Sequence, residues 1–194
     1  MSKIDVLLIT PPSRIEVYQN LSNELAAIEP PVWSSLIANY LIKANYSVKI
    51  LDAEASHLTH RETAEKIILE DPKLAVFIVY GQQPSASTQC MPASRKTAKI
   101  LNEISKKQLK TIVIGTHPSA LPKRTLEEEP YDYVCKGEGP LTIKILLDYL
   151  DGREKNIKNV PGLWYKDNDQ IEFNKTAPII ENLDKELNGQ AWNL

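Results

Sequence analysis

Cysteine is scarce in this chain of 194 residues, which contains only Cys90 and Cys135 and no CxxC pair. Two isolated cysteines predict free thiols in a reducing cytoplasm, and a disulfide between them is the alternative. With so few cysteines and three histidines, the chain cannot build an iron–sulfur cluster by itself.

The sequence also lacks a basic excess and a long apolar run. It carries 23 basic and 25 acidic side chains, for a formal net charge of -2, which argues against a nucleic-acid-binding surface. No apolar stretch approaches the ~20 residues needed to span a bilayer. The opening MSKIDVLLIT is also without the apolar length and the cleavage site of a signal peptide. We therefore expect a cytoplasmic protein that binds neither nucleic acid nor membrane.

Several nucleotide-binding and catalytic motifs are missing as well. GxGxxG does not follow the first apolar run, and neither GxSxG nor GxxxxGK followed by Ser or Thr occurs. A dinucleotide fingerprint, a P-loop and a nucleophile elbow are therefore unsupported. A phosphorelay receiver would place paired acids at the end of the first strand, where this chain has Thr10, Pro11 and Pro12.

What the sequence does contain is a regular alternation of apolar runs and helical patterns. Short apolar runs predict strands over residues 4–9, 47–51, 74–80, 111–114 and 131–136. Helices are expected over residues 15–28, 32–43, 91–106, 121–129 and 141–150, and another after Thr59, which forms a capping box with Glu62. This alternation predicts an α/β fold: a flavodoxin-like (Rossmann-like) five-stranded parallel sheet with helices on both faces, whose strand order reverses beside the first strand.

The pattern changes towards the C-terminus. Residues 163–166 and 170–174 flank a polar turn and predict a β-hairpin. The residues from 177 onward show no convincing periodicity. We expect an α/β domain over residues 1–152, a hairpin appendage over 153–176 and a linker or docking segment over 177–194.

Four loops marked by glycine or proline carry the candidate binding site. They read ITPPS, VYGQQPSAS, IGTHPSALP and CKGEGP, and each follows an expected strand. The carboxyl ends of parallel strands gather at one edge, where such folds bind ligands. The candidate binding residues are Thr10, Pro11, Pro12, Gly81, Gln82, Ser85, Ser87, Thr88, Gly115, Thr116, His117, Pro118, Gly137, Glu138 and Gly139.

These loop residues also have purely structural interpretations. The glycines suit tight turns, the serines suit helix caps, and the ring of His117 could bond a backbone group instead of a ligand. His57 and His60 are expected on the solvated surface, although two nearby histidines resemble half a metal site. Trp33 and Trp164 are expected to pack against the protein rather than to stack on a ligand.

Several segments, in order along the chain, are similar to one known family. They are EPPVWSSLIANYLIKANYSVKILDAEA, IGTHPSALP, YDYVCKGEGP and VPGLWYKDNDQIEFN. Together they resemble the N-terminal cobalamin-binding domain of cobalamin-dependent radical SAM enzymes. The ending IIENLDKELNGQAWNL is similar to the connector before the radical SAM barrel, so the resemblance covers essentially the whole chain.

This resemblance implies a ligand and a partner. The family's domain holds the corrin of cobalamin, and hence its cobalt, against the carboxyl edge of the sheet, with the nucleotide tail in the crevice beside the first strand. Carried over, Ser85, Thr88 and Glu138 would contact the corrin amides. The implied role is methyltransferase-like, with a radical SAM domain as partner in the same or a separate chain.

The chain departs from the family pattern at a few positions. Thr116 follows Gly115 where a second glycine is common, Asn45 is expected to end the helix in a left-handed conformation where glycine is usual, and Pro140 replaces an acid. The DxHxxG signature of methionine-synthase-like cobalamin modules is missing. Ligation of the cobalt by an imidazole from the first loop is therefore not expected.

The CxxxCxxC cluster motif is also absent. S-adenosylmethionine and a [4Fe-4S] cluster are therefore expected only in a missing domain, and the chain alone is not expected to be catalytic. We expect an excised or natural N-terminal fragment, or a chain that works with a separate catalytic one. The alternatives are a non-catalytic interaction module with a degenerate or empty ligand site, and a flavin enzyme of flavodoxin-like fold.

Overall fold

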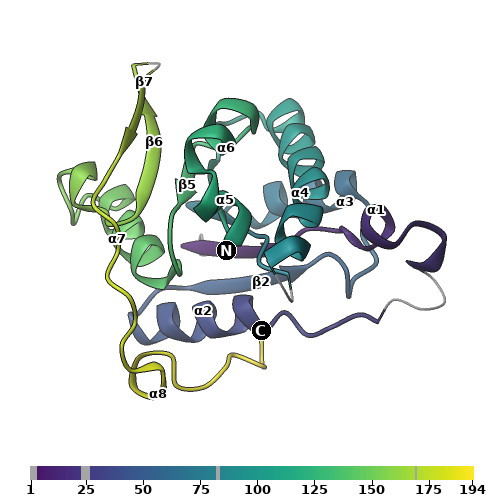
Figure 1. The fold of residues 1–194 in the computed structure, drawn as a ribbon, viewed down its shortest axis with the longest axis horizontal. Coiled ribbons are helices and arrows are strands. Elements are labelled where there is room, and N and C mark those ends of the chain that lie inside the picture. Colours follow the sequence, from purple (N-terminus) through teal and green to yellow (C-terminus); the bar gives the residue numbers. More distant parts are fainter. Residues whose placement is uncertain (1–3, 23–26, 82–83, 169) are drawn as a thin grey trace.

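The chain folds around one β-sheet with helices packed against it (Figure 1). The computed structural model describes residues 4–22, 27–81, 84–168 and 170–194. Its strands are β1 (Val6–Thr10), β2 (Val48–Asp52), β3 (Leu74–Ile78), β4 (Lys110–Ile114), β5 (Tyr133–Cys135), β6 (Leu163–Asp167) and β7 (Gln170–Phe173).

The strands lie in the order β2-β1-β3-β4-β5-β6-β7, and β1 to β5 run parallel. This confirms the predicted parallel sheet and its reversal beside the first strand. The sheet described here has seven strands instead of five, because the hairpin does not stand apart from it. β6 pairs antiparallel with β5, with Trp164 opposite Val134. The hairpin thereby covers the backbone edge that β5 would otherwise leave unpaired.

Helices fill the connections between the strands. They are α1 (Arg14–Tyr18), the 3-10 helix η1 (Gln19–Ser22), α2 (Val32–Lys43), α3 (His60–Glu70), α4 (Pro84–Ile104), α5 (Thr116–Ala120), α6 (Pro122–Glu128), α7 (Pro140–Leu150), the 3-10 helix η2 (Ile157–Asn159) and α8 (Leu183–Glu186). None of these, within the part of the chain that the structure describes, is both long and apolar enough to cross a membrane.

Two helices differ from the sequence expectations. α4 begins at Pro84 rather than near residue 91, so Pro92 lies inside the helix. Pro84 and Pro92 each suit a first helical turn, where the missing N–H is not needed. The sequence pattern favours Pro92 for that position. The helix expected over residues 15–28 is replaced by the shorter α1 and η1.

Two local predictions are confirmed at helix ends. Thr59 accepts a hydrogen bond from the backbone N–H of Glu62, whose carboxylate accepts one from the Thr59 N–H, which completes the capping box of α3. Asn45 follows α2 with a φ of 65°, the left-handed conformation that a short polar side chain tolerates.

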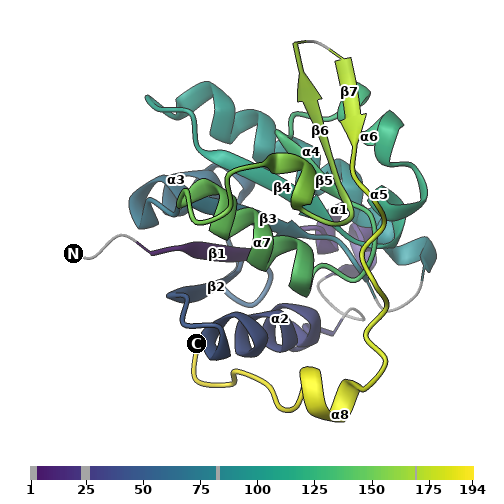
Figure 2. The ribbon, with the colours of Figure 1, turned by 90° about the vertical axis from the view of Figure 1, so that its left-hand side faces the viewer.

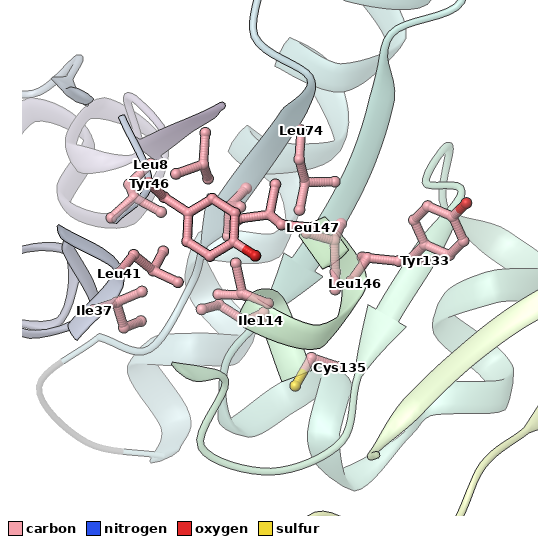
Figure 3. Packing of buried hydrophobic residues seen from close by; sticks show 14 of the residues in the cluster. Leu8, Ile37, Leu41, Tyr46, Leu74, Ile114, Tyr133, Cys135, Leu146 and Leu147 are labelled. Atoms are coloured by element: carbon pink, nitrogen blue, oxygen red, sulfur yellow. The ribbon is translucent and has the colours of Figure 1, made fainter. Parts of the chain in front are cut away.

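Each face of the sheet has its own apolar core. On one face, Leu8 and Ile114 pack against side chains of α2 and α7 such as Leu41 (Figure 3). On the other, Phe77 packs against side chains of α3 and α4 such as Leu101. Because successive residues of a strand point to opposite faces, a strand buried on both sides needs a continuous apolar run. Such runs make central strands such as β1 and β3 predictable from the sequence.

The C-terminal segment runs back along α2 (Figure 2). The side-chain amide of Asn39 in α2 donates hydrogen bonds to the carbonyls of Asn188 and Gly189, at 2.8 and 3.0 Å. Ala191 is buried, and its N–H donates to the carbonyl of Ser35. Part of the segment that the sequence predicts to be a linker or docking segment, residues 188–191, therefore contacts α2.

Candidate functional site

A cavity of about 510 Å³ opens at the carboxyl edge of the sheet, beside β1. It lies between the ends of β1, β2 and β3, the residues that lead into α2, and the start of α4. The lining includes Thr10, Trp33, Asp52, Tyr80 and Gly81. Its volume falls within the range of pockets that hold small-molecule ligands, roughly 300–1,000 Å³.

The residues predicted from the four loops divide into two groups. Thr10, Pro11 and Gly81 line the cavity. Pro12, Ser87, Thr88 and the candidates in the loops after β4 and β5 are not part of its lining, although those two loops lie at the same carboxyl edge. Gln82 lies outside the described residues, and so does the side chain of Ser85.

The loop after β4 is tied to α4 by hydrogen bonds. Ser87 is fully buried, donates its hydroxyl to the Val79 carbonyl and accepts the backbone N–H of His117 at 3.0 Å. The His117 Nδ1 lies 2.9 Å from the Thr88 hydroxyl oxygen. Gly115 precedes this loop with a φ of 155°, and a Cβ there would lie 2.5 Å from the Val79 carbonyl oxygen. These contacts fix the loop against the sheet, and only glycine fits at residue 115.

An aromatic pair at the cavity was not predicted from the sequence. The rings of Trp33 and Tyr80 stack with their centroids 4.5 Å apart. The Tyr80 hydroxyl donates to the carbonyls of Gly137 and Glu138, at 3.2 and 2.8 Å. Burial raises the pKa of Tyr80, so the phenol remains a donor at neutral pH. Tyr80 therefore joins the cavity to the loop after β5, and its position at the end of the expected strand over residues 74–80 was the available signal.

Two carboxylates at the cavity were also missed. Glu54 accepts hydrogen bonds from the backbone N–H groups of Ser13 and Arg14, and its other oxygen lies 3.7 Å from the Arg14 Nε. Asp52 accepts the N–H groups of Glu54 and Ala55, both at 3.1 Å. Burial nevertheless raises the pKa of Asp52 above its ordinary value. Asp52 ends β2 and Glu54 follows it closely, and this position beside β1 could have indicated both.

The expectation of a solvated His60 is wrong. Its Nε2 lies 2.6 Å from a Glu16 carboxylate oxygen and its Nδ1 lies 2.9 Å from the Thr97 hydroxyl oxygen. The ring therefore joins α1, α3 and α4. The two cysteines are free thiols, as predicted, and burial raises the pKa of Cys135 to about 11.

Together these features define a class of protein: a doubly wound α/β domain with a ligand cavity at the carboxyl edge of its sheet, beside the reversal of strand order. The family model of the B12 binding domain matches residues 20–147. The chain belongs to this family, which confirms the resemblance read from its sequence.

Curated relatives are longer than this chain. It is 30% identical over 187 residues to an uncharacterized methyltransferase of Pyrococcus horikoshii, a match that covers 95% of the chain and 38% of that protein. It is 26% identical over 171 residues to an anaerobic magnesium-protoporphyrin IX monomethyl ester cyclase of Cereibacter sphaeroides, with 86% and 27% covered. The chain thus spans well under half of these relatives.

Solved structures share the fold. The radical S-adenosylmethionine methyltransferase TsrM from Kitasatospora setae, with cobalamin and a [4Fe-4S] cluster bound, superposes with a TM-score of 0.65 at 17% identity, over 95% of this chain and 31% of that one. The cobalamin-dependent S-adenosylmethionine radical enzyme OxsB, with aqua-cobalamin and S-adenosylmethionine bound, gives 0.66 at 19% identity, over 94% and 23%.

Proposed function

We propose that this domain binds cobalamin at the carboxyl edge of its sheet and presents the cofactor to a radical SAM domain. The observation that carries the proposal is the cavity beside β1, found at the strand-order reversal in a member of the B12-binding family. In the proposed arrangement the nucleotide tail enters this cavity, and the broader corrin lies over the loops after β3, β4 and β5.

The residues at this edge fit such a ligand. The cavity is walled in part by apolar side chains such as Val17, Ile28 and Ile78, as expected for a pocket that takes a largely apolar group. In the loop after β5, no described atom lies within 4 Å of the position that a Cβ on Gly137 would occupy. A large ligand can therefore approach the Gly137 backbone closely.

Different residues are assigned different parts in binding. Backbone groups of the loops around Gly115 and Gly137 are proposed to contact the corrin amides, and Thr88 and Thr116 are exposed residues nearby. Buried Ser87 and the phenol of Tyr80 hold those loops in place instead of touching the ligand. When bound, cobalamin would supply a cobalt-bound methyl group for transfer.

The proposed partner is a radical SAM domain, which would supply S-adenosylmethionine cleavage and the [4Fe-4S] cluster. Support comes from the relatives: the chain covers less than two fifths of the Pyrococcus methyltransferase and about a third or less of TsrM and OxsB. Those enzymes therefore contain, in one polypeptide, a large region in addition to the part that this chain matches.

The proposal is tested by equilibrium dialysis of the purified chain against hydroxocobalamin under anaerobic conditions, with corrin absorbance as the readout. Dialysis is chosen because it detects binding too weak to survive desalting. We expect saturable uptake of one cofactor per chain, and no uptake of flavin mononucleotide in a parallel cell. Equal corrin concentrations on both sides of the membrane would contradict the proposal, and flavin uptake would favour the flavodoxin-like alternative.

A further inference from the structure

Trp33 is one of two exposed aromatic residues among the described residues that line the cavity, and Tyr18 is the other. It is the second residue of α2, it lines the cavity, and it is 45% exposed. Tryptophan carries a large apolar area and is usually well buried unless it contacts a partner or a ligand. The exposed part of the Trp33 ring, at the opening of a pocket, is therefore available to a ligand.

The position of the Trp33 ring is fixed by its neighbours. The indole stacks on Tyr80 at an interplanar angle of 23°, and Tyr80 is itself held by two hydrogen bonds to the loop after β5. Pro30 and Pro31 precede α2 and restrict the backbone that leads to Trp33. A ring held in this way loses little conformational freedom when a second planar group stacks on it.

The charges around the cavity indicate which part of the cofactor faces Trp33. Three acidic residues, Glu29, Asp52 and Glu54, are among the described residues that line it, against one basic residue, Arg14. Arg14 lies beside the Glu54 carboxylate. This balance disfavours a phosphate deep in the cavity, because like charges repel. An uncharged planar base is suited both to the acidic lining and to an aromatic ring.

We propose that Trp33 is the stacking platform for the planar heteroaromatic base at the end of the cofactor's nucleotide tail. This inference rests on the proposed binding of cobalamin. Stacking of a base on an aromatic side chain is sequence-tolerant and strong enough to change affinity by about tenfold or more. Trp33 would then favour complete cobamides over corrinoids that lack the nucleotide.

The test compares two corrinoids on matched variants. Cobalamin carries the nucleotide and base, whereas cobinamide lacks them, so stacking on Trp33 can contribute to the binding of cobalamin alone. Trp33→Leu keeps an apolar side chain and removes the ring, and Trp33→Phe keeps a smaller ring. Trp192→Leu is the control, because Trp192 is also exposed but is not among the residues that line the cavity.

We expect Trp33→Leu to weaken cobalamin binding by about tenfold and to change cobinamide binding by less than about twofold. Trp33→Phe should fall between wild type and Trp33→Leu, and Trp192→Leu should bind both corrinoids as wild type does. Circular dichroism melting of each variant checks that the fold is kept. Wild-type tryptophan fluorescence should be quenched by cobalamin, and most of that quenching should be lost in Trp33→Leu.

The outcomes separate the inference from the function on which it rests. If wild type binds cobalamin but Trp33→Leu binds it equally well, or loses cobalamin and cobinamide to the same extent, the stacking role is overturned and cobalamin binding stands. The stacking role is also overturned if wild type binds the two corrinoids with equal affinity. If wild type binds neither corrinoid, the proposed function fails and the inference fails with it.

Discussion

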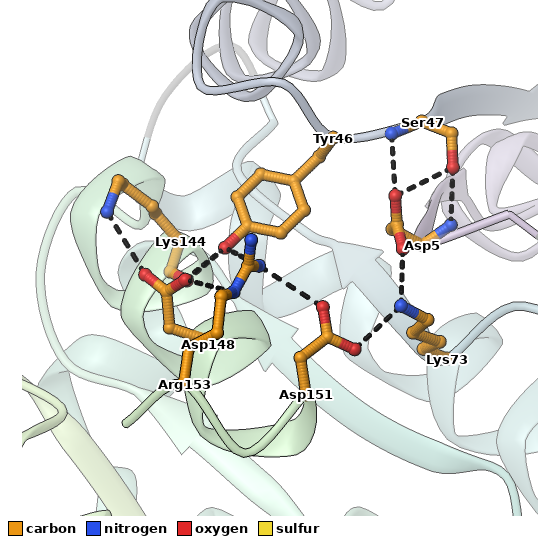
Figure 4. Close-up of polar contacts among 8 residues, drawn as sticks. All are labelled: Asp5, Tyr46, Ser47, Lys73, Lys144, Asp148, Asp151 and Arg153. Atoms are coloured by element: carbon orange, nitrogen blue, oxygen red, sulfur yellow. Dashed lines mark hydrogen bonds and ion pairs between the residues drawn. The ribbon is translucent and has the colours of Figure 1, made fainter.

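At the scale of single residues, a polar network joins the amino edge of the sheet (Figure 4). Asp5 accepts hydrogen bonds from the N–H and the hydroxyl of Ser47, both at 2.8 Å, and pairs with Lys73 at 2.7 Å. Lys73 also pairs with Asp151 at 2.6 Å. Burial opposes the ionisation of Asp5, but the bonds from Lys73 and Ser47 outweigh it, and the pKa of Asp5 lies below its ordinary value of 3.8.

Replacement of Asp5 by Asn should therefore destabilise the protein in a pH-dependent way. A lowered folded-state pKa adds stability above the unfolded-state pKa, and this contribution is lost as the pH falls through the folded-state value. We expect Asp5→Asn to reduce the free energy of unfolding by about 1–2 kcal/mol at pH 7. The difference from wild type should shrink as the pH falls below about 4.

Urea unfolding of both proteins at pH 7 and pH 3 measures this change. Glu65→Gln serves as the control, because Glu65 belongs to an exposed pair with Arg61 and such pairs contribute little. A stability difference for Asp5→Asn that is the same at both pH values would contradict the assigned pairing.

Gly115 offers a second prediction at this scale. A methyl group on its Cα would meet the Val79 carbonyl at 2.5 Å, at a φ of 155°, whereas the same group on Gly137, at a φ of 125°, would meet nothing within 4 Å. We expect Gly115→Ala to cost about 2–4 kcal/mol of stability and Gly137→Ala about 1 kcal/mol. Thermal melts of the pair separate the steric clash from backbone strain. Equal losses would show that the close approach to Val79 can relax.

At the scale of elements, the sequence was most informative where a signal is local. Buried strands such as β1 and β3 appear as continuous apolar runs, and the capping box at Thr59 marks the start of α3. The pairing of β6 with β5 was not predictable in this way, because the sequence pattern of a hairpin does not indicate which edge strand of the sheet it pairs with. The start of α4 was misplaced because two prolines each suit a first turn.

The candidate site was predictable only in outline, because contacts between residues that are distant in the sequence leave no local signal. Glycine and proline marked the right edge of the sheet, and Thr10, Pro11 and Gly81 line the cavity. The stacking of Trp33 on Tyr80 joins residues far apart in the sequence, and no local pattern encodes such a contact. The carboxylate of Glu138 accepts the N–H of Ile180 at 2.9 Å, and its expected contact with the corrin stays a prediction.

At the scale of the whole molecule, the two edges of the sheet differ in what they hold. The amino edge is joined by the ion pairs of Asp5, Lys73 and Asp151. The carboxyl edge holds the cavity, and the C-terminal segment contacts it through Ile180 and Glu138. The same segment is bound to α2 through Asn39. The contact of Ile180 with Glu138 and the contact of Asn188 with Asn39 are far apart along the segment. We therefore expect that either contact can be broken without breaking the other.

Substitution of Glu138 or of Asn39 should release a different part of the C-terminal segment. We expect Glu138→Ala to speed amide hydrogen exchange around residue 180, and Asn39→Ala to speed it around residues 188–191, because each change removes hydrogen bonds to that part alone. Global stability should change by less than about 1 kcal/mol in both variants, since the bonds are solvent-exposed. Asn102→Ala is the matched control, because its exposed amide bonds the Pro130 carbonyl instead. Release of the whole segment by either variant would mean that it docks as one cooperative unit.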